Sequence, residues 1–406
     1  MIGQLADEEG FSAYIVGGFV RDMLLGRANL DLDIVIEGDL FRLIDLLAKK
    51  VNVSVVRHRG FGTATAIFAD GFKIDFATAR KESYSHPAAL PGISFGSIED
   101  DLSRRDFTIN TLALQINKHN FGRLLDLFAG ADDLLQGVVR VLHNASFIDD
   151  PTRIFRAIRF EQRFDFNIEK NTERLIRAAL KQNMLRQLSK FRIGDEIILI
   201  LKEDEPVKSL LRINKVCGSL KFIHPAIKFD KALVGQLKSA YRIIQTFQKT
   251  YTDKPLDSWL VYLSILLSAL GSDSTDKICR RFCLVKKDIK KINTLKNRAK
   301  EVARALSKDI NLSYVQVYKM LKPFSYEGLA VILSMTESPL AKRRINLFIK
   351  KLSKIKITLS GQDLKKLNLK PGPGYRKILE ETLRAKISGK LNSKSDELRF
   401  VKERFK

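Results

Sequence analysis

Short apolar runs alternate with amphipathic stretches over the first 80 residues of the chain. Five runs rich in β-branched and aromatic residues predict strands, at residues 13–16, 32–36, 53–56, 63–68 and 72–78. Residues 19–25 and 40–51 carry apolar side chains at helical spacing. In the last strand the apolar residues alternate, so Lys73 and Asp75 share its polar face. This pattern predicts a mixed α/β domain.

The pattern changes after residue 80. Residues 80–97 combine prolines, glycines and serines and predict a loop. From about residue 142 onward nearly every apolar run has helical spacing. The most apolar stretch, residues 259–270, is too short to span a bilayer and predicts a buried helix. Breaks between helices are expected near residues 203–206, 252–255 and 322–326.

Composition and charge add a first indication of function. The chain has 406 residues, and its 45% hydrophobic content excludes an intrinsically disordered protein. Residues 1–150 carry 15 basic and 21 acidic side chains, whereas residues 151–406 carry 56 and 25, and residues 340–406 carry 20 and 6. An acidic front and a basic back indicate a metal-using catalytic unit joined to a unit that binds a polyanion. A solvated lysine-rich surface without a partner is the alternative.

The three cysteines are too few for a disulfide framework and predict a reducing compartment. Cys279 and Cys283 are four residues apart, but no second pair or histidine cluster completes a zinc site. Met1 to Gly10 lacks the apolar segment of a signal peptide. We therefore expect a soluble, cytoplasmic protein that does not associate with membranes, and nothing in the sequence indicates a stable protein partner.

A glycine pair lies between the first predicted strand and the first predicted helix. Gly17 and Gly18 allow the backbone to approach a phosphate, and the helix N-terminus adds a favourable dipole. Arg21, one turn later, can reach phosphate oxygens. The turn and its arginine predict a phosphate-binding site.

Three carboxylates accompany this turn. Asp31 and Asp33 are two apart on one strand and point to one face, and Asp75 lies on the polar face of another strand. Carboxylates arranged in this way can share a pair of divalent cations. Together with the phosphate-binding turn, they predict two-metal phosphoryl or nucleotidyl transfer.

Four motifs follow one another over residues 12–200. They are Gly-Gly-Phe-Val-Arg-Asp at 17–22, Asp-Leu-Asp at 31–33, Arg-Arg-Asp-Phe-Thr-Ile-Asn at 104–110, and Asp-Asp-Pro-Thr-Arg at 149–153. In this order they resemble the motifs of class II tRNA nucleotidyltransferases, the bacterial and eukaryotic CCA-adding enzymes, to which bacterial poly(A) polymerases are related. Farther along, Lys-Pro-Gly-Pro at 370–373 resembles the tail of some members.

The resemblance implies a fold. It implies an α/β polymerase-β-like nucleotidyltransferase head followed by all-α neck, body and tail domains. The expected boundaries are a catalytic head at residues 1–142, a nucleotide-selecting neck at 143–205, a body at 206–325 and a basic, tRNA-binding tail at 326–406.

The resemblance also implies roles for individual residues. Asp31 and Asp33 match the pair that binds metal, expected here to be Mg²⁺, and Asp75 completes the catalytic carboxylates. Arg105, Asp106 and Asn110 match a motif that recognises the ribose. The nucleotide-binding residues implied in all are Gly17, Gly18, Arg21, Arg105, Asp106, Asn110, Asp150, Arg153, Arg156 and Arg159.

The fourth motif suits the choice of base. Cytosine and adenine both present an exocyclic amine donor beside a ring-nitrogen acceptor, and uracil and guanine present the opposite pattern. A carboxylate at Asp150 and a guanidinium at Arg153 complement the first pattern. Where family members often have Glu, this chain has Asp149.

Arginines continue at helical spacing beyond the fourth motif. Arg153, Arg156, Arg159 and Arg163 form a stripe that favours phosphates, although a solvated helix face is the alternative. Farther on, Ser189, Arg192 and Glu196 resemble a motif that braces this helix, and we interpret them as structural support.

The expected activity is addition of CMP and AMP, from CTP and ATP, to the 3′ end of tRNA. The tRNA would be bound at its 3′ end and along its elbow side. Partial enzymes that add only A or only CC, and poly(A) polymerase, are alternatives on the same fold. In the family, loss of the loop at residues 80–103 accompanies loss of A addition, and its full-length spacing here argues against a CC-adding enzyme. An RNA-binding protein with an inactive head is the alternative that is not an enzyme.

Overall fold

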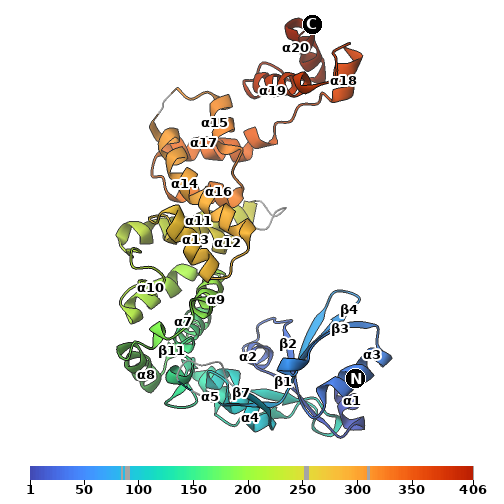
Figure 1. The fold of residues 1–406 in the computed structure, drawn as a ribbon, viewed down its shortest axis with the longest axis vertical. Coiled ribbons are helices and arrows are strands. Elements are labelled where there is room, and N and C mark those ends of the chain that lie inside the picture. Colours follow the sequence, from blue (N-terminus) through green and yellow to red (C-terminus); the bar gives the residue numbers. More distant parts are fainter. Residues whose placement is uncertain (84–85, 87–91, 251–255, 309–310, 406) are drawn as a thin grey trace. The chain divides into compact units, whose positions relative to one another are not determined.

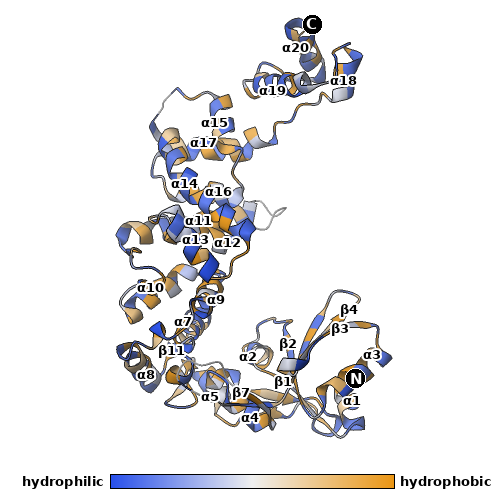
Figure 2. Cartoon of the chain, in the orientation of Figure 1, coloured by the Kyte–Doolittle hydropathy of each residue, from blue (hydrophilic) through white to orange (hydrophobic). Residues whose placement is uncertain are grey.

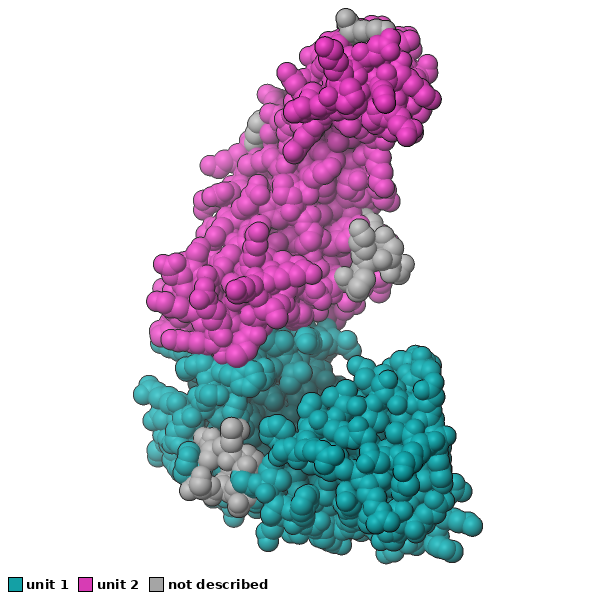
Figure 3. Space-filling model, turned by 45° about the vertical axis from the view of Figure 1, so that its right-hand side comes forward, with its two compact units in different colours: residues 1–222 teal, residues 223–406 magenta. Residues whose placement is uncertain are grey.

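The computed structural model describes residues 1–83, 86, 92–250, 256–308 and 311–405. The chain divides into two compact units, residues 1–222 and residues 223–406 (Figure 3). We describe each unit by itself. The four-part division expected from the sequence is finer than this and stays a prediction.

The first unit begins with a seven-stranded mixed sheet (Figure 1). The strand order is β3-β4-β5-β2-β1-β8-β9, in which β2 and β5 run parallel and the other neighbours antiparallel. The strands are β1 (Ser12–Val16), β2 (Leu32–Glu37), β3 (Val53–His58), β4 (Thr63–Phe68), β5 (Lys73–Thr78), β8 (Ala113–Gln115) and β9 (Leu124–Leu125). All five strands expected from the sequence are confirmed, within a few residues at each end.

The two faces of this sheet bury different residues. Ile34 and Ile36 of β2 and Ile74 and Phe76 of β5 form one core together with residues of the flanking helices. Those helices are α1 (Ile2–Glu8) and α3 (Leu40–Lys50). The polar alternate positions of β2 and β5 remain exposed on the opposite face, which places carboxylates there as the alternation of β5 predicted.

The loop expected at residues 80–97 is only partly correct. β6 (Arg80–Ser83) and β7 (Gly92–Phe95) pair antiparallel, with Arg80 opposite Phe95. All four residues of β7 are exposed, and the more buried side chains of β6, Arg80 and Glu82, are charged, so the pair lacks the apolar alternation that produces a recognisable strand pattern. Residues 84–85 and 87–91 between the two strands lie outside the described residues.

The remainder of the first unit is mainly helical. The short strands β10 (Val138–Val139) and β11 (Asn167–Ile168) pair parallel, and α7, α9 and α10 pack against one another. The helices of this unit beyond α1 and α3 are α2 (Gly18–Leu24), α4 (Ile98–Ser103), α5 (Gly130–Gln136), α6 (Ser146–Asp149), α7 (Arg153–Phe164), α8 (Lys170–Lys181), α9 (Lys190–Leu201) and α10 (Pro206–Cys217). α10 lies in the first unit and packs against α7 and α9, and the boundary expected between neck and body stays a prediction.

The second unit is helical throughout its described residues. Its helices are α11 (Lys231–Thr250), α12 (Ser258–Leu266), α13 (Ser272–Arg281), α14 (Lys286–Lys308), α15 (Tyr314–Leu321), α16 (Tyr326–Ser334), α17 (Pro339–Lys350), α18 (Gly361–Lys366), α19 (Pro373–Ile387) and α20 (Lys394–Phe405). The apolar helices α12 and α16 are almost wholly buried against α11 and α14, which confirms the buried helix expected at residues 259–270 (Figure 2).

The last three helices of this unit have an apolar core of their own. Leu359, Leu364, Leu367, Ile378 and Val401 form it. None of the helices in the described residues is long and apolar enough to cross a membrane. The break expected near residues 252–255 lies outside the described residues. The breaks expected near 203–206 and 322–326 separate α9 from α10 and α15 from α16.

Candidate active site

The turn between β1 and α2 requires glycine at its first position. Gly17 has a φ of 68°, and a Cβ built there would lie 2.7 Å from Nη1 of Arg105. A side chain would therefore meet both backbone strain and a neighbouring guanidinium. Gly18, the first residue of α2, has no comparably close neighbour. The structure thus explains Gly17 by its conformation and leaves the second glycine open to a ligand.

Arg21 is held firmly at the end of this turn. Its side chain is buried, its Nη1 donates to Oδ1 of Asn110 at 2.7 Å, and its Nε donates to Asp22 at 2.8 Å. Its guanidinium carbon also lies 5.3 Å and 4.7 Å from the ring centroids of Phe160 and Phe164 on α7. Because these partners come from three segments of the chain, Arg21 is fixed in position before any ligand binds.

The three carboxylates lie on neighbouring strands. Asp33 of β2 is directly opposite Asp75 of β5, and Asp31 immediately precedes β2. Asp75 accepts a hydrogen bond of 2.5 Å from the hydroxyl of Thr65. The register of Asp33 with Asp75 agrees with the shared face expected from the sequence. Asp31 was expected on the same strand as Asp33, but it lies just before the first residue of β2, so that part of the expectation is wrong.

The charge around Asp33 is mainly negative. Desolvation, followed by the Asp31 carboxylate and, less strongly, Asp75, raises the pKa of Asp33, and only Arg105 opposes this. A bound cation would reduce the repulsion between these carboxylates. The described residues contain no group of three or more His, Cys, Asp or Glu in a metal-holding arrangement. Two carboxylates whose remaining ligands come from substrate phosphates and water are, however, a normal donor set for Mg²⁺, so the residues present fit a divalent cation.

Residues 104–110 lie between α4 and β8 and contact α7 through Asp106. Oδ1 of Asp106 accepts from Nδ2 of Asn110 at 2.9 Å, and its Oδ2 accepts from Nε of Arg156 at 2.7 Å. Burial alone would raise the pKa of Asp106, but Arg156, the Asn110 amide and Arg153 together hold it below its ordinary value. Asp106 is therefore a buried anion that orients Asn110, whose carbonyl in turn holds Arg21.

The arginine stripe of α7 has acidic partners that its own sequence did not reveal. Arg156 and Arg159 each lie 3.6 Å from Glu196 of α9, and Arg163 lies 2.5 Å from Glu203. Glu196 therefore braces α7, as the sequence suggested. These ion pairs neutralise much of the stripe, and a phosphate-binding role for its arginines stays a prediction.

The carboxylate and the guanidinium expected to recognise the base lie at adjacent helix ends. Asp150 directly follows α6, and Arg153 is the first residue of α7. Oδ1 of Asp150 accepts from the backbone and hydroxyl of Thr152, and Nη2 of Arg192 lies 2.7 Å from it. Nη2 of Arg153 donates to the carbonyl of Arg104 at 2.9 Å, and its buried Nη1 has no hydrogen-bond partner among the described residues. Arg153 is thus anchored through one nitrogen and has another available for a ligand.

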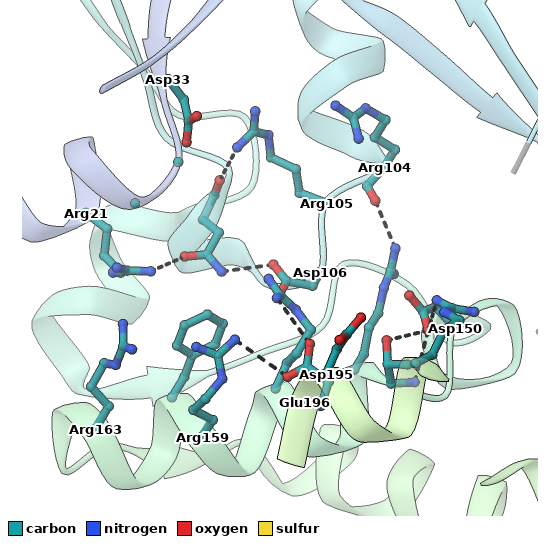
Figure 4. A pocket seen from close by; sticks show the side chains of 18 of the residues that line it. Arg21, Asp33, Arg104, Arg105, Asp106, Asp150, Arg159, Arg163, Asp195 and Glu196 are labelled. Carbon is teal, nitrogen blue, oxygen red and sulfur yellow. Dashed lines mark hydrogen bonds and ion pairs between the residues drawn. The ribbon is translucent and has the colours of Figure 1, made fainter. Parts of the chain in front are cut away.

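These groups line a single pocket of about 680 Å³ within the first unit (Figure 4). Of the residues expected from the sequence, Asp31 and Asp75 are not among those that line it. The others all line it, namely Gly17, Gly18, Arg21, Asp33, Arg105, Asp106, Asn110, Asp150, Arg153, Arg156 and Arg159. Eight arginines and no lysine are among the described residues that line it.

Comparison with known proteins gives two family matches. Residues 13–140 match the poly A polymerase head domain, and residues 165–229 match a probable RNA- and SrmB-binding site of polymerase A. The chain is 31% identical to an A-adding tRNA nucleotidyltransferase of Halalkalibacterium halodurans, over 100% of this chain and 91% of the relative.

The chain belongs to the tRNA nucleotidyltransferase family. A solved structure agrees, since the Thermotoga maritima CCA-adding enzyme complexed with tRNA has 32% sequence identity and a TM-score of 0.75, over 100% of this chain and 94% of that one. The chain is also 38% identical to an A-adding tRNA nucleotidyltransferase of Geobacter sulfurreducens, over 98% of this chain. It spans only 46% of the length of that relative. The family and the fold expected from the four motifs are confirmed.

Several lining residues of this tRNA nucleotidyltransferase family member were missed or undervalued by sequence reasoning. Arg192 was interpreted as structural support only, yet it lies in the pocket and holds Asp150. Glu82 lines the pocket and accepts from Nη1 of Arg104 at 2.9 Å. Asp195, next to Glu196, also lines it. Arg192 could have been predicted, because it belongs to the motif of Ser189, Arg192 and Glu196. Glu82 could not, because it lies in a segment that the sequence predicted to be a loop.

Proposed function

We propose that the chain transfers a nucleotide from a nucleoside triphosphate to the 3′ end of tRNA without a nucleic-acid template. One observation carries this proposal: the glycine turn at Gly17 and Gly18, the Asp33 carboxylate and the donor–acceptor pair of Arg153 and Asp150 line the same pocket. The 3′-oxygen of the RNA attacks the α-phosphorus, the bond between the α- and β-phosphates breaks, and pyrophosphate leaves.

The pocket residues divide this task. Gly18 and Arg21 bind the triphosphate, and the fixed position of Arg21 limits the conformational entropy lost on binding. Arg105, Asp106 and Asn110 face the ribose, whose 2′-hydroxyl can both donate and accept a hydrogen bond.

Asp150 and Arg153 select the base. The carboxylate accepts from the exocyclic amine of cytosine or adenine, and the available nitrogen of Arg153 donates to the ring nitrogen. Arg192 and Thr152 orient the carboxylate without occupying both of its oxygens, because their contacts are to Oδ1.

Asp31 and Asp33, with Asp75 beside them, hold divalent cations, which we propose to be Mg²⁺. When bound, the ions supply activation of the 3′-hydroxyl and neutralisation of the triphosphate charge. The raised pKa of Asp33 supports this assignment, since a cluster of like charges is stabilised by a cation.

Two products are compatible with this pocket, and they differ in which nucleotides are added to the tRNA. Addition of both C and A is the expectation from the motifs, and a CCA-adding enzyme of Leuconostoc mesenteroides is 28% identical over 98% of this chain. Addition of A alone is favoured by the names of the Geobacter and Halalkalibacterium relatives, at 38% and 31% identity. We therefore rank A addition beside CCA addition, with the same pocket serving either.

One experiment distinguishes these products and tests the activity itself. tRNA transcripts that end before C74, after C75 and after A76 are incubated with each labelled triphosphate and Mg²⁺. A full CCA-adding enzyme extends the first two, an A-adding enzyme extends only the second, and a poly(A) polymerase extends all three with ATP. No incorporation with any transcript would contradict the proposed function.

A further inference from the structure

A second cavity, of about 900 Å³, is lined only by residues of the second unit and shares no lining residue with the first pocket. Residues of α14, α15, α16 and α17 and of the segment after α17 line it. Its volume is in the range of small-molecule sites. The proposed chemistry of the first pocket uses none of these residues, so the cavity needs an explanation of its own.

Four lysines and no arginine are among the described residues that line this cavity, and three of the lysines lack an acidic partner there. Nζ of Lys322 donates to the hydroxyl of Tyr318 at 2.5 Å. Lys354 and Lys356 are exposed, and neither side chain has a hydrogen bond or ion pair to a described residue. Lys291 differs, since it lies 3.9 Å from Asp257. The rim therefore carries positive charge that the described part of the protein does not itself neutralise.

The acidic residues of the cavity do not cancel this charge. Asp257 lies near Lys291, and buried Glu327 accepts from the backbone N–H of Asp257 at 3.3 Å. Within the described part of the chain, neither carboxylate forms an ion pair with any of the other three lysines. Three uncompensated ammonium groups around one cavity are a favourable environment for phosphate oxygens.

The floor of the cavity is aromatic. Tyr318, Phe324 and Phe348 are at most 8% exposed, and Tyr326 is half-buried. Tyr318 and Phe348 pack with ring centroids 5.9 Å apart, so this part of the floor is rigid. A ligand that suits both parts of the cavity has a phosphate for the lysine rim and a flat, partly apolar group for the aromatic floor.

We infer that this cavity binds one nucleotide unit of the RNA substrate, by its phosphate and its base, at a place remote in sequence from the catalytic motifs. The inference rests on the proposed function for the identity of the RNA. A nucleotide of the RNA is favoured over a free nucleotide, because residues 223–406 carry 40 basic and 16 acidic side chains, an excess suited to a polyanion. The cavity would thus hold an unstacked nucleotide while the lysines contact its phosphate and those adjoining it.

The test compares two charge-matched variants of the full chain. One changes the rim lysines, Lys322→Gln, Lys354→Gln and Lys356→Gln. The control changes three exposed lysines of α11 and α14 outside the cavity, Lys238→Gln, Lys287→Gln and Lys300→Gln. Binding of a tRNA transcript is measured without triphosphate at two salt concentrations, so the result does not depend on whether the protein adds nucleotides.

The rim variant should lose at least tenfold more tRNA affinity than the control, and the corresponding triple Lys→Arg variant should retain binding. Equal losses in the two Lys→Gln variants would overturn the inference, because general electrostatic attraction would then explain both. Thermal unfolding of each variant shows whether it is folded. If the rim variant is unfolded, the single change Lys354→Glu, at an exposed side chain, replaces it with the same expected direction of effect.

Two further measurements test the base and the source of the nucleotide. A single-stranded oligoribonucleotide should bind more tightly than an abasic oligomer of equal length, and Tyr326→Leu should reduce that preference. Binding of ATP alone, followed by calorimetry, should be the same in the rim variant and the control. If the rim variant instead loses ATP binding while retaining tRNA binding, the occupant is a free nucleotide and the assignment to RNA is wrong.

Discussion

The two units carry positive charge in different ways. Residues 1–222 have 31 basic and 30 acidic side chains, and 19 of the basic ones are arginine. Residues 223–406 have 40 basic and 16 acidic side chains, and 29 of the basic ones are lysine. The same contrast holds for the described linings of their cavities, since arginine supplies the cations of the first pocket and lysine those of the second.

The difference follows from the chemistry of the two side chains. An arginine guanidinium has five donors in a fixed plane, so it can hold a protein acceptor and a ligand at once. Arg153 is placed to do this while it donates to the backbone carbonyl of Arg104, and Arg156 while it donates to the carboxylate of Asp106. Ion pairs among these groups fix a geometry that selects a small ligand. Lysine is a mobile point charge that suits a long polyanion and loses its contribution as salt rises. If the proposed function is correct, arginine with acidic partners is typical of the unit that selects the nucleotide, and a lysine-rich surface is typical of the unit that holds the RNA.

The largest expected effect is a loss of nucleotide addition without a loss of tRNA binding. Asp31→Ala or Asp33→Ala should reduce nucleotide addition by at least about a thousandfold, because loss of a metal ligand costs several kcal/mol of barrier. tRNA affinity should stay within about threefold of the original, since the charge that holds RNA lies in the second unit. Steady-state addition assays and filter binding measure the two quantities.

Asp132→Asn provides a matched control for that experiment. Asp132 is an exposed carboxylate of α5 that does not line the pocket. It should retain both activity and binding. More than a tenth of the original turnover in either Asp31→Ala or Asp33→Ala would mean that the cation is held elsewhere.

The contrast also explains what could be read from the sequence. The strands, the glycine turn and the carboxylates are encoded by local alternation and spacing, so Asp33 and Asp75 could be placed on one face before the structure was known. The full set of partners of the arginine stripe could not be placed in this way. Glu196 of α9 was indicated only by the resemblance, and Glu203, just beyond α9, was not indicated at all, because helix packing decides which faces meet.

Two other features escaped sequence reasoning for different reasons. The pairing of β6 with β7 has no apolar face, because β7 is exposed and the more buried side chains of β6 are Arg80 and Glu82, so hydrophobic periodicity carries no signal for it. The lysine-rimmed cavity draws Lys291 and Lys354 together across more than 60 residues of helical sequence, and lysine density alone did not show that a cavity exists there. Both features depend on contacts between residues far apart in the sequence, which local patterns do not reveal.

Removal of α18, α19 and α20 tests whether the second unit binds the tRNA. The break should follow Ile357, because α17 packs against α14, α15 and α16, whereas α18–α20 share a separate apolar core. Loss of residues 358–406 removes 13 basic and 6 acidic side chains. Affinity for full tRNA should fall by about tenfold to a hundredfold. Its dependence on salt should become shallower, by about 0.7–0.9 in log–log slope for each phosphate that the protein no longer binds.

A short acceptor-stem minihelix serves as the comparison ligand for this truncated protein. If α18–α20 hold the elbow side of tRNA, minihelix affinity should change much less than tRNA affinity. An equal loss for the two RNAs would identify these helices as a folding element, and the melting temperature of the truncated protein would then fall as well.

A smaller effect is expected within the selecting unit. Asp150→Ala or Arg153→Ala should raise incorporation of UTP and GTP relative to that of ATP by about tenfold, because one half of the donor–acceptor pair is removed. Arg21 and Gly18 remain in place, so triphosphate affinity should change less than the ratio. Competition assays with paired labelled triphosphates measure the ratio directly.

The control for base selection is Arg174→Ala, an exposed arginine of α8 that lies outside the pocket. A further variant, Arg192→Ala, should produce a weaker form of the Asp150→Ala effect, since Arg192 orients that carboxylate at 2.7 Å. A uniform decrease for all four triphosphates in the Asp150 and Arg153 variants would make this pair structural and remove its role in selection.

The smallest expected effect concerns the pH dependence of metal binding in the first unit. Desolvation and the neighbouring Asp31 raise the pKa of Asp33, and Arg105 lowers it. A raised pKa means that protons compete with a cation for this carboxyl at a higher pH than they do at an ordinary aspartate, so the Mg²⁺ concentration needed for half-maximal addition should be higher at pH 6 than at pH 8. Arg105→Gln removes the opposing cation, raises the pKa of Asp33 further and should increase that requirement by about twofold to fivefold more at pH 6 than at pH 8. Carbon NMR titration of the Asp33 carboxyl gives a readout that does not depend on activity.

The control for this prediction is Arg57→Gln, which removes a guanidinium of β3 paired with Asp45 and should leave both measurements unchanged. An equal effect of Arg105→Gln at the two pH values would place its action on the nucleotide and not on Asp33.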